Sequence, residues 1–146
     1  MLKNFVNAWD KNKGELENYF RTHPLSDYYF NYTNLVKLLF DMVINPEMEY
    51  EFDRYRTGDD EIHVIDDGDY QGTYIFLLHK DTYQPGVSDY IYTSVWYGSC
   101  SGCDTLQSIC SYADDTDFAT EEQIEGYMEL CLHLLQNCNY ICTYLD

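Results

Sequence analysis

Two cysteines spaced as Cys-x-x-Cys, Cys100 and Cys103, are the residues whose types and spacing most directly suggest chemistry. They lie in the stretch YGSCSGCDTLQ, residues 97–107, between a segment of strand-like composition and a segment with helical character. At the N-terminus of a helix, free N–H groups and the positive end of the helix dipole lower the pKa of a thiol. This position would therefore suit reactive or metal-binding thiolates.

Three interpretations of the pair stay open. A redox dithiol needs this geometry, but it usually belongs to an alternating β/α fold, and the adjacent carboxylate of Asp104 disfavours thiolates. A structural zinc site needs two more ligands, which the chain could supply from Cys110, His63, His79, Cys138 or Cys142. In the third interpretation the two cysteines are small buried residues of a tight Gly-Ser turn.

Other catalytic patterns are absent from the sequence. There is no phosphate-binding loop, dinucleotide fingerprint or H-E-x-x-H, and Ser99 and Ser101 lack the G-x-S-x-G context of a hydrolase. Cys131 and Cys138 lie seven residues apart on an apolar stripe, which predicts core positions, and His133 is predicted to be at the surface. The sequence therefore favours a protein that is not an enzyme.

Acidity is the second feature. The chain has 26 Asp and Glu against 8 Lys and Arg, a formal net charge of −18. Solubility alone needs a net charge of only about 2–8 in magnitude, and the excess destabilises a compact fold by self-repulsion. The acidic residues are concentrated between positions 47 and 69 and between positions 114 and 129.

The acidic blocks have two interpretations: a solvated surface that keeps an aromatic-rich chain soluble, or carboxylates that imitate phosphates and bind a basic partner. Under the second, the candidate partner-binding residues are Glu47, Glu49, Glu51, Asp59, Asp60, Glu61, Asp66, Asp67, Asp114, Asp115, Asp117, Glu121, Glu122 and Glu125. Nucleic acid and anionic membranes would themselves be repelled.

The hydrophobic periodicity indicates which elements position these groups. Helices are predicted over residues 2–20, with a possible break near Gly14, and over residues 33–44, ended by Asn45-Pro46. A short helix is expected over residues 103–112, and a final helix is capped by Thr120 with Gln123.

Strands are predicted over residues 62–66, 70–80 and 89–97, with an edge strand over residues 48–56 that would place Glu47, Glu49 and Glu51 on one face. Asp67-Gly68 suggests a two-residue hairpin turn, and Gly72 a bulge or a close approach. The order predicts an α+β fold: a small antiparallel β-meander with N-terminal and C-terminal helices packed on it, in one domain over residues 1–146.

No segment approaches the roughly 18 consecutive apolar residues of a membrane span, and the N-terminus is unlike a secretion signal. A cytoplasmic protein is therefore expected. In that compartment the six cysteines would be reduced thiols or metal ligands.

Residues 65–106 resemble a family of small phage and prophage proteins from low-GC Gram-positive bacteria. The matching pieces are GDYQGT at 68–73, TYQP at 82–85 and YGSCSGCDTLQ at 97–107. The resemblance implies a phage context but no particular mechanism. As a class, small acidic phage proteins resemble inhibitors of host defence: DNA mimics, anti-restriction proteins and anti-CRISPR proteins.

The expected function is therefore a phage-encoded inhibitor that binds a basic, nucleic-acid-binding host defence protein, with a CRISPR nuclease as the first candidate, and blocks its nucleic-acid engagement. Two alternatives stay open. One is a small structural zinc-binding protein, with Cys100 and Cys103 as ligands, whose acidity is incidental. The other is a Cys-x-x-Cys thiol redox protein.

Overall fold

In the part of the chain that the structure describes, four antiparallel strands form a sheet in the order β1-β2-β3-β4. The computed structural model describes residues 3–25, 31–99, 104–110 and 118–141. The strands are β1 (His63–Asp66), β2 (Gly72–His79), β3 (Tyr90–Tyr97) and β4 (Asn139–Tyr140). The main helices are α1 (Lys3–Thr22), α2 (Tyr32–Leu39), α3 (Thr105–Cys110) and α4 (Glu121–Gln136). The predicted α+β meander is confirmed. The sequence did not predict β4, because a strand of two residues has no recognisable pattern.

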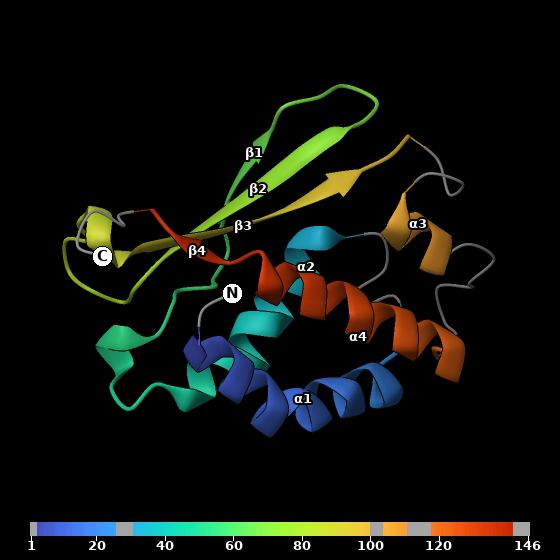
Figure 1. Ribbon diagram of the computed structural model, residues 1–146, viewed down its shortest axis with the longest axis horizontal. Coiled ribbons are helices and arrows are strands. Elements are labelled where there is room, and N and C mark those ends of the chain that lie inside the picture. The colour runs from blue at the N-terminus through green and yellow to red at the C-terminus, as the bar shows by residue number, and fades with distance from the viewer. Residues whose placement is uncertain (1–2, 26–30, 100–103, 111–117, 142–146) are drawn as a thin grey trace.

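The helices cover one face of the sheet (Figure 1). Alternate residues of the two central strands point to that face, where Phe76 pairs with Thr93 and Leu78 with Ile91, and all four are buried. They join buried side chains of the helices, such as Phe20 and Tyr127, in one hydrophobic core. The opposite face, which carries Ile65 and Trp96, stays about half exposed.

The N-terminal helix continues through Gly14, so the predicted break there is wrong. Nothing lies within 4 Å of a Cβ placed on Gly14, so this glycine marks an exposed helical position and no close contact. The buried residues on either side, Trp9 and Leu16, hold the helix on the core. Packing of this face outweighs the modest helix propensity of one glycine.

The second helix begins as predicted and ends differently. Asn31 caps it, because its side chain accepts a hydrogen bond from the N–H of Asn34 at 3.2 Å. The helix then widens into a π-helical turn, η2 (Phe40–Ile44). Asn45 keeps α-region dihedrals despite preceding a proline, contrary to the expected effect of Pro46. Two 2.9 Å hydrogen bonds between the Asn45 side chain and the backbone of Tyr55 hold it there.

The predicted edge strand over residues 48–56 is wrong. The segment contains a short 3-10 turn, η4 (Glu51–Asp53), and another, η3 (Asn45–Glu47), precedes it. Only its end meets the sheet, through an isolated bridge between Tyr55 and Lys80. A strand needs a neighbouring backbone along its length, and the alternating side chains do not supply one. Glu47, Glu49 and Glu51 therefore do not form a row on one strand face.

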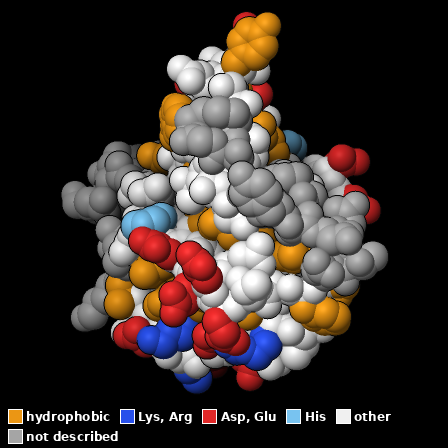
Figure 2. All heavy atoms as spheres, turned by 90° about the vertical axis from the view of Figure 1, so that its right-hand side faces the viewer, with side chains coloured by type: hydrophobic (Ala, Val, Ile, Leu, Met, Phe, Trp, Pro, Cys, Tyr) orange, Lys and Arg blue, Asp and Glu red, His pale blue; other side chains and the backbone are white. Residues whose placement is uncertain are grey.

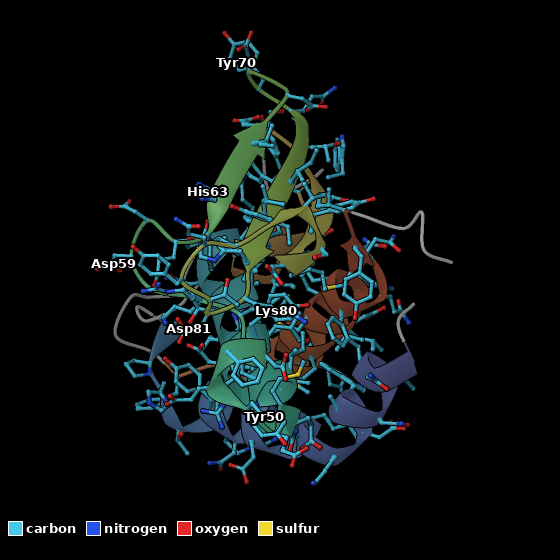
Figure 3. All side chains as sticks on the ribbon, turned by 90° about the vertical axis from the view of Figure 1, so that its left-hand side faces the viewer. Tyr50, Asp59, His63, Tyr70, Lys80 and Asp81 are labelled. Carbon is cyan, nitrogen blue, oxygen red and sulfur yellow. The ribbon has the colours of Figure 1, made fainter. Side chains whose placement is uncertain are left out.

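The hairpin between β1 and β2 has a longer loop than the predicted two-residue turn. β1 ends at Asp66 and β2 begins at Gly72, so the connection consists of residues 67–71, with Tyr70 at its tip (Figure 3). The Asp67 carboxylate accepts a 2.6 Å hydrogen bond from the N–H of Thr73 and closes this loop. The predicted close approach at Gly72 is confirmed, because a Cβ there would lie 2.9 Å from the Cα of Gly68.

The last helix follows the sequence closely. Thr120 and Gln123 form the predicted capping box, with hydrogen bonds of 3.1 and 2.9 Å. Its apolar stripe is buried against the core. No helix within the described residues is both long enough and apolar enough to cross a membrane.

Candidate functional site

The buried carboxylate of Asp104 organises the 97–107 segment. Asp104 is 3% exposed. Its Oδ1 accepts hydrogen bonds from the Gln107 N–H at 3.0 Å and from the Tyr32 hydroxyl at 2.9 Å, and its Oδ2 accepts one from the Gly98 N–H at 2.9 Å. The Gln107 amide also donates to the Gly98 carbonyl at 3.3 Å. Asp104 therefore caps α3 and ties together the two residues that flank positions 99–103.

The two cysteines of the motif, Cys100 and Cys103, lie outside the described residues. Where the chain is described, no group of three His, Cys, Asp or Glu side chains is placed to hold a metal ion. The zinc and redox interpretations of the pair both stay predictions.

Cys131 and Cys138 are free thiols in the core, as predicted. Burial raises the pKa of both thiols to about 12, from an ordinary value of 9.0. The thiol of Cys138 donates to the Leu134 carbonyl at 3.4 Å. Such neutral, enclosed thiols are poor nucleophiles.

Two of the candidate histidine ligands lie on the sheet, and the third histidine lies on α4. His63 and His79 both point to the open face of the sheet, where His63 pairs with Leu77, so the two histidines occupy diagonal positions and not directly opposed ones. Nδ1 of His79 lies 2.9 Å from the Lys80 carbonyl. His133 is exposed on α4, as predicted.

A cavity of about 310 Å³ lies between the start of α2, the helix-facing side of the sheet and residues 104–107. Its aromatic lining comes from Tyr32, Tyr74, Phe76 and Tyr97. Tyr74 is central among them: its ring centroid lies 4.1 Å from that of Tyr97, in a stacked arrangement, and 6.0 Å from those of Tyr32 and Phe76. Asp104 and Gln107 also line the cavity, so its wall is aromatic with a carboxylate.

A second carboxylate adjoins the same rings. The Tyr97 hydroxyl donates to Asp66 and lies 2.9 Å from the Gly68 carbonyl. This hydrogen bond lowers the pKa of Asp66 and raises the pKa of the Tyr97 phenol. Burial, together with the charges of Asp66 and Asp104, raises the pKa of Tyr74. The phenols therefore stay protonated at neutral pH, and the site is a neutral aromatic wall beside acidic groups.

The candidate partner-binding carboxylates differ in whether a basic side chain or a hydrogen-bond donor of the same chain lies beside them. Glu47, Glu61 and Glu121 form ion pairs with Lys11, Arg56 and Arg21 respectively. Asp66 and Asp67 accept hydrogen bonds within the hairpin. Among the described residues, no Lys or Arg nitrogen lies within 4 Å of the carboxylates of Glu49, Glu51, Asp59, Asp60, Glu122 or Glu125. Asp114, Asp115 and Asp117 lie outside the described residues.

These carboxylates do not form one continuous surface. Figure 3 places Asp59 on the side of the molecule opposite α4. On the face shown in Figure 2, acidic side chains gather beside Lys and Arg side chains near the lower edge. The unneutralised groups therefore occupy separate places, of which the exposed side of α4 is the most regular.

Sequence reasoning missed the role of Asp104, although a signal was present. Asp104 followed by Gln107 has the spacing of a helix N-cap with a Gln at the third helical position. Its contact with Tyr32 carries no comparable local signal.

Comparison with protein-family models, curated proteins and solved structures finds no match to this chain.

Proposed function

We propose that this protein is a phage-encoded inhibitor that acts inside the bacterial host by binding a basic, nucleic-acid-binding defence protein, and that it is not an enzyme. A CRISPR nuclease is the first candidate partner. The observation that carries the proposal is the row of exposed carboxylates on α4, of which Glu122 and Glu125 have no Lys or Arg within 4 Å in the described part of the chain. The phage context comes from the resemblance of residues 65–106.

The geometry of this row suits a site built for nucleic acid. Glu122, Glu125 and Glu129 are separated by three and four residues, so they lie on one side of the helix. Their rise along the helix axis is about 4.5 and 6 Å per step, while each strand of DNA carries one charge about every 3.4 Å of its axis. The row is thus a line of negative charges with spacing of the same order as that of a DNA strand, and a groove of Lys and Arg side chains attracts both.

The internal ion pairs support the same proposal, because they use much of the basic charge. Five basic side chains, Lys11, Arg21, Lys37, Arg56 and Lys80, are within 4 Å of carboxylates of the same chain. Most of the acidic excess is left for an external partner. Attraction between such surfaces speeds association more than it strengthens the final complex.

A zinc ion held by Cys100 and Cys103 is the second proposal. The observation that favours it is the hydrogen bonding of Gly98 and Gln107 to Asp104, which brings the flanks of the Cys-x-x-Cys together. Elemental analysis of protein purified without chelator should find about one zinc per chain. Cys100→Ser should then lose the metal and lower the melting temperature. Metal-free protein of unchanged stability would exclude this proposal.

A pull-down from the lysate of a susceptible host, followed by kinetic measurement on the captured nuclease, tests the inhibitor proposal. Glu122→Lys with Glu125→Lys should slow association strongly, and binding of the unmodified chain should weaken as salt rises. The matched control is Asp10→Lys with Glu15→Lys on α1, which gives the same net charge. Equal effects of the two double variants would show that only the overall charge matters, and salt-independent binding would contradict the proposal.

Stoichiometry separates an inhibitor from a catalyst. An inhibitor that occupies its target should abolish nuclease activity at a fixed molar ratio. Progressive loss of nuclease activity at a substoichiometric ratio would instead show turnover and contradict the proposal.

A further inference from the structure

The cavity beside Asp104 contains a feature that the inhibitor proposal does not use: a buried carboxylate without a cation. In the described residues, the hydrogen bonds to Asp104 come from a phenol and two backbone N–H groups, all neutral donors. None of the ion pairs formed by the described Lys and Arg side chains includes this carboxylate. Asp is rarely this buried unless it is paired, because loss of water disfavours the isolated charge.

The rest of the cavity wall supplies the other half of a cation site. Tyr32, Tyr74 and Tyr97 lie in one contiguous cluster of rings on the cavity wall. The face of an aromatic ring carries partial negative charge and attracts ammonium and guanidinium groups within about 6 Å of its centroid. Asp66 adds a second negative group at the edge of the cluster, where it holds the Tyr97 hydroxyl.

The volume of the cavity and the negative charge of the protein both suit a small cationic ligand. Its volume of about 310 Å³ is at the lower end of ordinary ligand pockets, which hold about 300–1,000 Å³. A net charge of −18 raises the local concentration of cations and lowers that of anions. Anionic ligands such as phosphates would be repelled here, and no Lys or Arg is among the described residues that line the cavity.

We propose that this cavity is a binding site for an organic cation, an alkylammonium or guanidinium group held between the tyrosine rings and the carboxylate of Asp104. None of the described residues that line the cavity belongs to α4, and the site stands whether or not the chain binds a nuclease. The cation can be a free small molecule or the end of a Lys or Arg side chain, because both present the same chemistry.

NMR titration of the full-length chain tests the site with three probes: tetramethylammonium chloride, N-acetyl-lysinamide and N-acetyl-argininamide. Sodium chloride at the same ionic strength serves as the reference for non-specific screening. The backbone signals of Tyr74, Gly98 and Leu106 should move saturably with at least one organic cation and not with sodium. Binding of tetramethylammonium would indicate a free cation, and binding of the amino-acid amides alone would indicate a protein side chain.

Matched variants assign the binding to these residues. Asp104→Asn should weaken it by about tenfold or more, whereas Glu122→Gln, which removes the same charge from α4, should leave it unchanged. Tyr74→Leu should weaken it to a similar extent, and Tyr74→Phe, which keeps the ring, should preserve it. If Asp104→Asn fails to fold, the comparison of Tyr74→Leu with Tyr74→Phe tests whether the cation binds in this cavity. Shifts that equal those with sodium, or equal affinity of Tyr74→Leu and Tyr74→Phe, would overturn the proposal.

Discussion

The hydroxyl of Tyr32, the first residue of α2, donates a 2.9 Å hydrogen bond to Oδ1 of Asp104, which lies 72 residues further along the chain. The same hydroxyl accepts a hydrogen bond from the N–H of Leu106 at 3.2 Å. One phenol therefore connects the N-terminus of α2 to the N-cap and first turn of α3. Because Tyr32 is buried, its pKa is raised and the hydroxyl remains a donor at any ordinary pH.

Removal of this hydroxyl should destabilise the fold. Tyr32→Phe leaves Asp104 with one hydrogen bond fewer and leaves the Leu106 N–H without this acceptor, so we expect a loss of about 1–3 kcal/mol in the free energy of unfolding. Urea denaturation measures it. The control is Tyr83→Phe, because Tyr83 is 96% exposed and its hydroxyl should contribute nothing. Equal stability of the two variants would show that the contact is unimportant for folding.

Tyr97 should control the acidity of Asp66. In Tyr97→Phe the carboxylate loses its phenol donor and keeps the Gly68 N–H, so its pKa should rise toward the ordinary value of 3.8. A lowered pKa in the folded state means that the stabilising effect is present above pH 3.8 and is lost as pH falls through the folded-state value. NMR titration of the Asp66 carboxyl measures the change. An unchanged pKa in the variant would contradict the assigned cause.

The buried thiols should be inert in the native state and should limit stability at high pH. Cys131 and Cys138 should resist alkylation at pH 8 and react once the chain is unfolded. Their pKa values are raised by burial, so the stability they contribute is complete below pH 9.0 and is lost between pH 9.0 and about 12. Cys131→Ala with Cys138→Ala should reduce this alkaline slope. Rapid alkylation of either thiol in the folded protein would contradict the burial.

Two glycines should respond to alanine in opposite directions. Gly14→Ala should stabilise the chain by about 0.5–1 kcal/mol, because this helical position has open space around it. Gly72→Ala should be destabilising, because the new Cβ would lie 2.6 Å from Oδ1 of Asp67, the atom that closes the hairpin loop. Thermal unfolding of the two variants provides the comparison. The same direction of change in both would show that the close approach at Gly72 is relieved without cost.

Local signals in the sequence determined the helices and the capping of α4. Thr120 and Gln123 interact within one turn, so their residue types suffice to predict the hydrogen bonds that the structure contains. The same holds for β2 and β3, whose β-branched and aromatic residue types predict strands at these positions. The acidic excess is likewise a property of composition, and the sequence alone suggests its proposed role in binding.

Tertiary structure alone decided which carboxylates remain without cations, how the hairpin turns and where the cavity lies. Residues 48–56 alternate like a strand but have no backbone neighbour along their length, so they form short turns instead. Glu121, a candidate partner-binding residue, is bound by Arg21, which lies 100 residues earlier in the chain. The contact of Tyr32 with Asp104 and the ring cluster around Tyr74 have the same origin. Periodicity and capping depend on neighbours within a few residues, whereas these contacts depend on how distant segments pack.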